Sequence, residues 1–586
     1  MLLNTLRAKC NLPVPFHGGN YLTDTDQKMM KKSFPRRLLL CFFVVFFATV
    51  PLLAQPAAPA PSAGNLAAVL KYIDEGWTTL GRSQTECKAV FDGRNPDNSV
   101  LYVPAEMKIT PELRELETKC KIHVRNLPGP INKAGQMANE KFSPQGLLYL
   151  PNPYVVPGGF FNEMYGWDSY FIILGLLQDK QVDVARGMVD NFLFEIEHYG
   201  TVLNANRTYF LSRSQPPFLT SMIMGVHEAN KKNGVDDKAW LARAYPIAAH
   251  DYEFWATGKH LAGNTGLSRY FDFGEGPGPE ITDPKDSYYL DVAKHLAANP
   301  QLKQDYLVPA AQSKTPATWP RFTLAMCRGT AKDQKCGKPA EYAFTEDYYK
   351  GDRSDRESGF DITFRFGPFA GSTHHFAAVG LNSLLYKYEQ DMIELAKLTG
   401  HKEDVAKWQK RSEGRKAAVD KYLWDAKSGM YFDYDTVKNA RTSYNYATTF
   451  YPLWAGMASK EQAKAVAANL KKLERPHGLS TSDVESGVQW DLPYGWAPLQ
   501  LLAAEGLRRY GFAEDANRLS VEWLQTIMTN FKKDGTIREK YNVVTGSSEF
   551  KATAGYQANV VGFGWTNGVF LELLSKLPES DKQKLK

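Results

Sequence analysis

The chain has 586 residues, of which 43% are hydrophobic and 23% are charged, as is usual for a globular protein. Most of the formal net charge of +6 lies in residues 1–54, so the rest of the chain is close to neutral. A near-neutral chain offers no extended basic surface, and we expect no nucleic-acid partner. Aromatic residues make up 13% of the sequence and gather in clusters along its length.

Residues 1–54 have the pattern of an export leader. Four basic residues between positions 31 and 37 precede an apolar run of 17 residues, 38–54, which ends at the small residue Ala54. This arrangement is typical of a cleavable secretory signal peptide, with the true start at Met29 or Met30. We therefore predict an exported protein, periplasmic or secreted. An uncleaved membrane anchor is the alternative, because the run is nearly long enough to span a bilayer.

A Pro/Ala-rich linker is expected at 55–75, followed by one large domain over 76–586. In 376–400, leucines and other apolar residues recur at spacings of three and four, which predicts an amphipathic helix. Similar runs occur at 169–198, 216–232, 238–256, 459–473, 496–509 and 514–531. Strand-like alternation is scarce, and 430–437 is its best example. Successive helix pairs predict an all-α domain, closed into a toroid or wound into a superhelical solenoid.

Four cysteines follow the leader: Cys87, Cys120, Cys327 and Cys336. An even number suits an oxidising compartment. Their local spacing favours the disulfides Cys87–Cys120 and Cys327–Cys336, which is one of three possible connectivities. No CxxC pair with matching histidines suggests zinc.

Common cofactor signatures are missing from the sequence. It has no Walker A loop, no HExxH and no GxSxG, and the glycine-rich 274–280 lacks the context of a dinucleotide site. His374 and His375 are adjacent, so in a helix their rings would point about 100° apart. We expect no cofactor and no metal site.

Several loops combine carboxylates with many aromatic rings. In 157–171, Glu163 and Asp168 stand among six aromatic residues. A buried core avoids unpaired acids and a solvated loop avoids large rings, whereas a pocket for a neutral, hydroxyl-rich ligand uses both. Comparable mixtures occur at 204–217, 356–366, 489–498, 537–546 and 562–568. Loops at one end of a helical scaffold converge, which predicts a sugar site. The alternative is that the acids only cap helices.

Two of these stretches resemble the signatures of a known family. PGGFFNEMYGWDSY resembles the first signature of the trehalases, family 37 of the glycoside hydrolases, PGGRFxExYxWDxY. QWDLPYGWAP matches their second signature, QWDxPxGWxP, at every fixed position. SRSQPP, ESGFD, EKY and GFGWTNG follow in the family's order, so that the resemblance spans residues 140–575. It implies an (α/α)6 toroid of the six-hairpin glycosidase type and an exported, inverting hydrolase that splits α,α-trehalose into two glucoses. We expect a small sugar as its substrate, no protein partner and a monomer.

The resemblance also implies the roles of single residues. Asp361 in ESGFD corresponds to the general acid and Glu539 in REKY to the general base. Cleavage with inversion needs such a pair roughly 6.5–9.5 Å apart, with the acid protonated and the base ionised. The implied sugar-contacting positions are Trp167, Asp168, Asn204, Arg213, Ser214, Gln215, Glu280 and Gly359. Trp490 is expected to form an apolar wall of the pocket.

The sequence departs from the family at two arginines. Phe160 follows PGG where the family has arginine, and Gly278 replaces the arginine of RPE. Each lost guanidinium removes charge-assisted hydrogen bonds of about 1.5–3 kcal/mol. We expect a wider pocket with a weaker polar grip on trehalose. The alternatives are therefore a hydrolase for another α-glucoside or disaccharide, or a sugar-binding protein on the same fold. The retained pair of carboxylates favours an enzyme, since binding alone does not need them.

Overall fold

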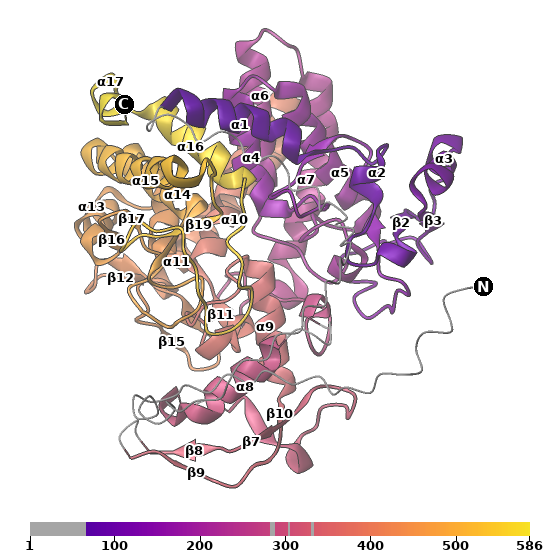
Figure 1. Ribbon diagram of the computed structural model, residues 1–586. Helices are drawn as coiled ribbons and strands as arrows, with labels where there is room; N and C mark the ends of the chain where they lie inside the picture. The colour runs from indigo at the N-terminus through magenta and orange to yellow at the C-terminus, as the bar shows by residue number, and fades with distance from the viewer. Residues whose placement is uncertain (1–65, 282–286, 303–304, 330–332, 586) are drawn as a thin grey trace, which may run out of the picture. The chain divides into compact units, whose positions relative to one another are not determined.

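The computed structural model describes residues 66–281, 287–302, 305–329 and 333–585, which all belong to the compact unit Ala58–Lys586 (Figure 1). The predicted signal peptide and both proposed start positions lie outside the described residues. Helix α1 (Leu66–Leu80) begins inside the range 55–75 expected to be a linker. Val69, Ile73 and Trp77 form one buried face of α1, which packs against α15 and α16. Among the helices described, none has the length and apolar character needed to cross a membrane.

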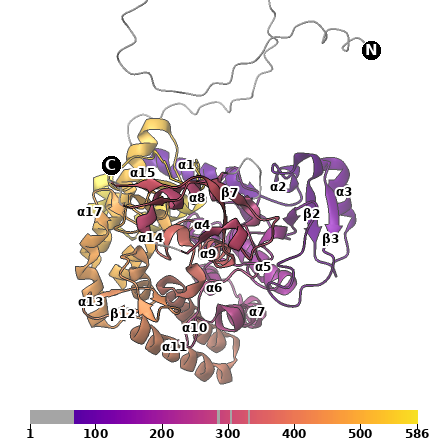
Figure 2. The same ribbon diagram turned by 90° about the horizontal axis from the view of Figure 1, so that it is seen from below.

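Within the described residues, six helices form a closed ring in which each packs against the next and the last packs against the first (Figure 2). They are α4 (Gly166–Gln178), α6 (Leu219–Lys232), α10 (Val379–Thr399), α12 (Tyr451–Trp454), α14 (Ala497–Arg509) and α16 (Gly564–Lys576). In α4 and α16 most residues of the first three turns are buried on every side. Such helices are expected at the centre of a helical protein.

A second layer of helices surrounds this ring. It contains α1, α5 (Val182–Tyr199), α7 (Lys238–Ala256), α11 (Lys402–Tyr422), α13 (Lys460–Ala468) and α15 (Ala513–Asp534). These helices are amphipathic; α15, for example, buries Leu519, Leu524 and Ile527 along one face. The arrangement is the expected (α/α)6 toroid, and the closed ring excludes the solenoid. The predicted helical run 169–198 is divided between α4 and α5.

The ring closes where α4 and α16 come into very close contact. A Cβ atom on Gly568 would lie 2.0 Å from the backbone oxygen of Phe171, and one on Gly175 would lie 2.6 Å from the Cα of Gly568. Only glycine allows two backbones to approach so closely. The glycine that ends GFGWTNG therefore serves packing, and it fixes α4, which carries two predicted site residues.

Two segments outside the ring contain strands that the sequence pattern did not predict. Near the N-terminus, the parallel strands β2 (Val100–Val103), β3 (His123–Asn126) and β4 (Leu147–Leu148) pack with α2 (Cys87–Val90) and α3 (Pro111–Cys120). Between α7 and α9, the second segment lies at the bottom of Figure 1. It contains α8 (Tyr288–Ala298), β6 (Leu307–Pro309), β7 (Arg321–Leu324), β8 (Cys327–Arg328), β9 (Lys335–Cys336) and β10 (Ala340–Phe344).

Each of these segments contains one disulfide. Cys87 is bonded to Cys120, and Cys327 is bonded to Cys336, with sequence separations of 33 and 9 residues. These are the two pairs that the local spacing favours. The first bond joins α2 to α3, and the second joins the paired strands β8 and β9.

The remaining strands form short antiparallel sheets of two or three strands. They are β1 (Gly81–Arg82) with β5 (Tyr154–Val155), β11 (Phe376–Ala377) with β14 (Tyr434–Asp435) and β15 (Ala440–Arg441), β12 (Trp424–Asp425) with β13 (Met430–Tyr431), β16 (Glu474–Arg475) with β17 (Gly478–Leu479), and β18 (Tyr494–Trp496) with β19 (Lys540–Asn542). The predicted strand 430–437 is thus split between β13 and β14. Helix α9 (Glu346–Ser358) precedes α10, and α17 (Glu579–Lys582) lies near the C-terminus.

Candidate active site

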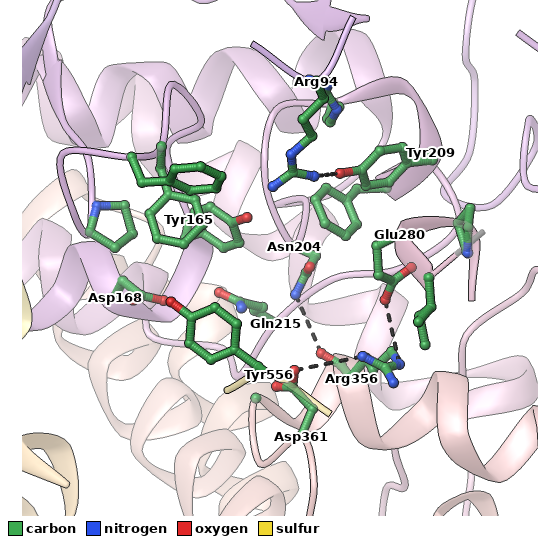
Figure 3. Close-up of a pocket in the computed structure, with 18 of the residues that line it drawn as sticks. Arg94, Tyr165, Asp168, Asn204, Tyr209, Gln215, Glu280, Arg356, Asp361 and Tyr556 are labelled. Carbon is green, nitrogen blue, oxygen red and sulfur yellow. Dashed lines mark hydrogen bonds and ion pairs between the residues drawn. The ribbon is translucent and has the colours of Figure 1, made fainter. Parts of the chain in front are cut away.

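A cavity of about 1070 Å³ contains most of the residues that the sequence singles out (Figure 3). Of the predicted site residues, those that line it are Phe160, Trp167, Asp168, Asn204, Arg213, Gln215, Glu280, Gly359, Asp361, Trp490 and Glu539. Ser214 and Gly278 do not. The loops that supply the lining are far apart in the sequence, and the ring of helices brings them together.

Asp361 enters the cavity from the turn that ends α9. Gly359 caps this helix with φ +74°, and a Cβ atom there would lie 2.8 Å from the ring of Trp167. The position therefore requires glycine for both its backbone angle and its close contact. The Asp361 side chain is 41% accessible, yet burial by the surrounding protein raises its pKa to about 6, although Arg356 opposes the shift. This carboxyl can hold a proton in mildly acidic solution.

The second signature holds the backbone that follows Asp361. The Gln489 side chain donates a hydrogen bond to the Asp361 carbonyl, and the Trp490 N–H donates to the Ile362 carbonyl at 3.1 Å. The Asp491 carboxylate accepts from the Phe364 N–H at 2.9 Å. Asp491 thus holds a loop, so the alternative that it only caps a helix does not apply. Three consecutive residues of QWD position the loop that carries Asp361.

Glu539 lies far from Asp361 in the sequence, just before β19. Its Oε2 atom is 2.7 Å from Nζ of Lys540, which is fully buried. Burial lowers the pKa of Lys540, while the charge of Glu539 acts to raise it. The ammonium also lies 4.9 Å from the ring centroid of Trp496. This ion pair places a positive charge directly beside the Glu539 carboxylate. Lys540 stands next to Glu539 in the sequence, but nothing in the pattern indicated its role.

Asp168 lies in the first turn of α4, and its carboxyl group faces the cavity (Figure 3). Burial raises the pKa of Asp168 well above its ordinary value, and the charges of Glu539 and Asp361 raise it further. The three carboxyl groups therefore share one electrostatic environment. A protonated Asp168 can donate a hydrogen bond to a sugar hydroxyl, whereas an ionised one can only accept.

The polar groups that line the cavity near Asp361 are held by one another. Oδ1 of Asn204 accepts from Arg213 at 3.3 Å, and its Nδ2 donates to the Arg356 carbonyl at 3.4 Å. The side-chain oxygen Oε1 of Gln215 accepts from the backbone N–H of Trp167 at 2.9 Å, which fixes the start of α4. The hydrogen-bonding groups of these side chains are therefore fixed in direction before a ligand binds, which favours specific recognition of hydroxyls.

Glu280 is held between two arginines. Arg213 is 2.7 Å from its Oε1 atom and Arg356 is 3.5 Å away. Burial alone would raise the pKa of Glu280, but the two guanidiniums lower it to about 2. Arg356 was missed by the sequence reasoning, although it stands in the same motif as Asp361. It supplies a guanidinium beside Glu280 from α9, where the family has an arginine at the position of Gly278.

The expected roles of Gly278 and Ser214 need correction. Gly278 does not line the cavity. A Cβ atom there would lie 3.3 Å from Oε2 of Glu280, so the missing side chain does not leave open space at the sugar site. Ser214 is fully buried, with its hydroxyl bonded to the Val202 carbonyl. Its neighbours Arg213 and Gln215 line the cavity, and Ser214 points the other way because side chains alternate in an extended segment.

Aromatic rings form the apolar walls of the cavity. Trp490 stacks on Trp496 with ring centroids 3.8 Å apart, and Trp167 lies 5.9 Å from Trp490. These flat faces suit the apolar faces of sugar rings. Phe160, in contrast, is 76% exposed at the edge of the cavity and packs only its edge against Phe161.

His374 and His375 lie in a short 3-10 helix, Thr373–His375, and neither is among the described residues that line the cavity. Both Nε2 atoms lie 3.0 Å from Oδ1 of Asp347, so the prediction that the rings diverge is wrong. The two rings converge because the segment is not α-helical. The Nδ1 atom of His374 is buried without a partner in the described structure, whereas a metal ligand usually donates from that nitrogen. The ligand atoms of Asp347, His374 and His375 lie within 4.8 Å of one another, so the three side chains form one hydrogen-bonded cluster.

The sequence is similar to curated fungal enzymes. It is 37% identical to the cytosolic neutral trehalase of Saccharomyces cerevisiae over 524 residues, which cover 82% of this chain and 66% of the relative. It is 39% identical to the cytosolic neutral trehalase of Kluyveromyces lactis over 453 residues, which cover 72% of this chain and 56% of the relative. The chain thus matches between about half and two thirds of the length of these relatives.

These names contradict the prediction of export. That prediction, with its periplasmic or secreted location, depended only on the basic flank and apolar run of residues 31–54. The matched relatives are named as cytosolic proteins, so the prediction is wrong. Composition alone cannot tell a signal peptide from another apolar segment with a basic flank.

The fold and the family agree. The structure of neutral trehalase Nth1 from Saccharomyces cerevisiae superposes with a TM-score of 0.71 at 33% identity, over 89% of this chain and 95% of the other. The trehalase family model matches residues 80–320 and 326–578, which include the loops that line the cavity. The chain belongs to the trehalase family.

Proposed function

We propose that the protein hydrolyses α,α-trehalose to two glucose molecules with inversion at the anomeric carbon. One observation carries the proposal: Asp361, with its raised pKa, and Glu539, paired with Lys540, line the same cavity. Burial favours the protonated form of Asp361, as a general acid requires, and a cation lies beside the Glu539 carboxylate. Membership of the trehalase family and the names of the relatives support the substrate.

In this mechanism Asp361 donates its proton to the glycosidic oxygen as the bond to the anomeric carbon breaks. Glu539 removes a proton from a water molecule that attacks the same carbon from the opposite face. One glucose leaves with the proton of Asp361, and the other keeps the hydroxyl of the water with inverted configuration. Proton transfer by each group contributes about 10²–10⁴-fold to the rate.

The remaining lining residues bind and orient the sugar. Trp167 and Trp490 cover apolar faces, while Asp168, Asn204 and Arg213 offer hydrogen-bonding groups to hydroxyls. Arg356 acts beside the acid: 3.8 Å from Asp361, it limits the rise in pKa that burial causes. The carboxyl is therefore kept in a range where it can both hold and release its proton near neutral pH.

The test is glucose release by the purified full-length chain from trehalose and from a panel of other α-glucosides, with Asp361→Asn as the inactive control. We expect trehalose to be cleaved and the control to release almost no glucose. Cleavage of another α-glucoside without trehalose would move the assignment to a different substrate. Binding of trehalose, measured by calorimetry, without any hydrolysis would indicate a sugar-binding protein.

A further inference from the structure

A segment outside the ring of helices forms one edge of the cavity. Asp92, Gly93, Arg94 and Asn95 line it, and they lie between α2 and the 3-10 helix Pro96–Asn98. None of the family signatures includes this segment. Figure 3 shows Arg94 at the opposite end of the drawn residues from Asp361, with its guanidinium directed among the other lining side chains.

The Arg94 guanidinium is held in place without being buried. It donates a hydrogen bond to the hydroxyl of Tyr209, and its Nη2 atom lies 4.0 Å from Oε1 of Glu163. Glu163 is itself paired with Arg207 at 3.3 Å, and Arg207 is paired with Asp92. A guanidinium carries five N–H groups, so these contacts leave donors that can face a ligand.

Arg94 is the most accessible of the four arginines that line the cavity. Its side chain is 37% exposed, against 2% for Arg207, 3% for Arg213 and 10% for Arg356. The other three each form ion pairs with two or more acids of the described structure. Arg94 is therefore the cation best placed to meet a ligand that enters the cavity.

The segment of Arg94 is bonded to the loop that carries Phe160. Nδ2 of Asn162 donates to the Phe91 carbonyl at 2.8 Å. Arg82 donates to the carbonyls of Gly159 and Phe161 at 3.1 and 3.0 Å, which holds the loop from behind. The phenyl ring of Phe160 cannot donate a hydrogen bond, whereas Arg94 in the neighbouring segment can, and both residues line the cavity.

The charges of the lining favour a neutral ligand at this edge. Among the described residues that line the cavity, four arginines stand against the carboxyl groups of Asp92, Asp168, Glu280, Asp361 and Glu539. Such a balanced site gives an anionic ligand no net attraction. The residues around the reacting centre are buried, with Trp167 and Trp490 each 2% exposed, whereas Phe160 and Arg94 lie at the open edge. A disaccharide would place its inner ring at the buried end and its outer ring beside Arg94.

We infer that Arg94 is a substrate-binding and specificity-determining residue that donates hydrogen bonds to hydroxyls of the outer sugar ring. The inference deepens the proposed function and rests on it. In this chain a guanidinium from the N-terminal segment takes the place that the family signature gives to an arginine at position 160. Because Arg94 lies far from the reacting atoms, its contribution is to binding and appears in KM more than in kcat.

Steady-state kinetics with trehalose on the full chain test this inference. Arg94→Met is expected to raise KM at least about tenfold, equivalent to 1.4 kcal/mol, with kcat changed less than about threefold. Arg94→Lys keeps the charge but loses the planar fork, and should raise KM at least about threefold. Arg125→Met is the matched control, since Arg125 lies on β3 and is exposed, and it should leave KM unchanged.

A rescue variant separates binding from a merely structural role. Phe160→Arg in the Arg94→Met background should recover most of the lost affinity, because it returns a guanidinium to the same edge. An Arg94→Met variant with native circular dichroism and unchanged KM would overturn the inference. If Arg94→Met does not fold, Arg94→Lys with native circular dichroism and unchanged KM would overturn the inference.

A failure of the inference about Arg94 can be distinguished from a failure of the proposed function. If the wild type cleaves none of the α-glucosides, the hydrolase proposal fails, and trehalose binding to wild type and Arg94→Met is compared by calorimetry. A dissociation constant at least about tenfold weaker in the variant supports a binding role for Arg94. Equal binding, or no binding to either protein, overturns it.

Discussion

The Asp491 carboxylate accepts a hydrogen bond from the backbone N–H of Phe364 at 2.9 Å, three residues after Asp361. The same carboxylate accepts from Ser486 at 2.6 Å and from Thr363 at 3.2 Å. With Gln489 bonded to the carbonyl of Asp361, the second signature holds the loop of the proposed general acid from one side. Asp491 does not line the cavity, so it influences the reaction through the position of Asp361.

Replacing Asp491 by alanine should therefore impair catalysis without removing a group that touches the substrate. A displacement of about 1 Å at a catalytic group can cost about 10²-fold in rate. We expect kcat for trehalose to fall about 10–100-fold in Asp491→Ala and less in Asp491→Asn, which keeps one acceptor oxygen. The control is Asp483→Asn, because Asp483 binds Asn445 in the same segment. Normal kcat in Asp491→Ala would contradict the positioning role.

Asp361→Asn and Glu539→Gln should each lower kcat by about 10²–10⁴-fold, since each removes one proton-transfer group. Both changes conserve side-chain volume, so the melting temperature should change little. The measurement is kcat for trehalose together with thermal unfolding of each variant. A folded variant with near-normal kcat would remove that residue from the mechanism.

The pH profile should reflect the pKa of Asp361, which burial raises to about 6. Only the protonated carboxyl can donate, so kcat/KM is highest below this pKa and falls as the pH rises through about 6. Arg356 lowers the pKa of Asp361, and Arg356→Met should therefore move the alkaline limb to higher pH. Arg356→Lys keeps the charge and should leave it near the wild-type position. If the alkaline limb of Arg356→Met stays at the wild-type position, it does not report the ionisation of Asp361.

Lys540→Met should weaken the general base. The change removes the ammonium 2.7 Å from Glu539 and leaves that carboxylate without its cationic partner in a buried place. Losing one partner of a buried charged pair costs about 2–5 kcal/mol. We expect kcat to fall at least about tenfold, because the Glu539 carboxylate loses the cation that holds it in place. Lys551→Met, a change at an exposed lysine, is the control; equal kinetics in both variants would contradict the role of Lys540.

The two disulfides should differ in their contribution to stability. The bond between Cys87 and Cys120 closes a loop of 33 residues and the bond between Cys327 and Cys336 one of 9 residues. On chain entropy alone, the longer loop contributes about 1 kcal/mol more. Unfolding of the double-serine variants of each pair measures this difference, and mass spectrometry of the non-reduced protein identifies the bonds. Alkylation of all four of Cys87, Cys120, Cys327 and Cys336 in purified, unreduced protein would show that neither bond forms.

The helices could be predicted because they repeat apolar residues at spacings of three and four over long runs, whereas the choice of a toroid over a solenoid came from the family resemblance. For example, α7 occupies Lys238–Ala256, the run expected from the sequence. The strands of β2–β4 and β6–β10 are two to five residues long and depend on packing against distant segments, so a local pattern does not reveal them. The division of 169–198 at the turn after Gln178 was missed for a similar reason.

The lining residues in the two signatures could be predicted from their sequence context, but their partners could not. Lys540 and Arg356 stand beside predicted residues, yet their roles depend on charges brought near by folding. Arg94 lies outside every signature, and only the fold places it at the cavity. Ser214 shows the opposite error: its motif resembles a binding site, but its side chain is turned into the protein.

Proton NMR of the first products from trehalose tests the central claim most directly, because it follows the configuration at the cleaved carbon. Before mutarotation mixes the anomers, general acid–base catalysis by Asp361 and Glu539 predicts equal amounts of α-glucose and β-glucose. The α-anomer comes from the leaving sugar and the β-anomer from the attacked one. Exclusive early release of α-glucose would mean retention, and it would contradict the assignment of Glu539 as the base that activates water.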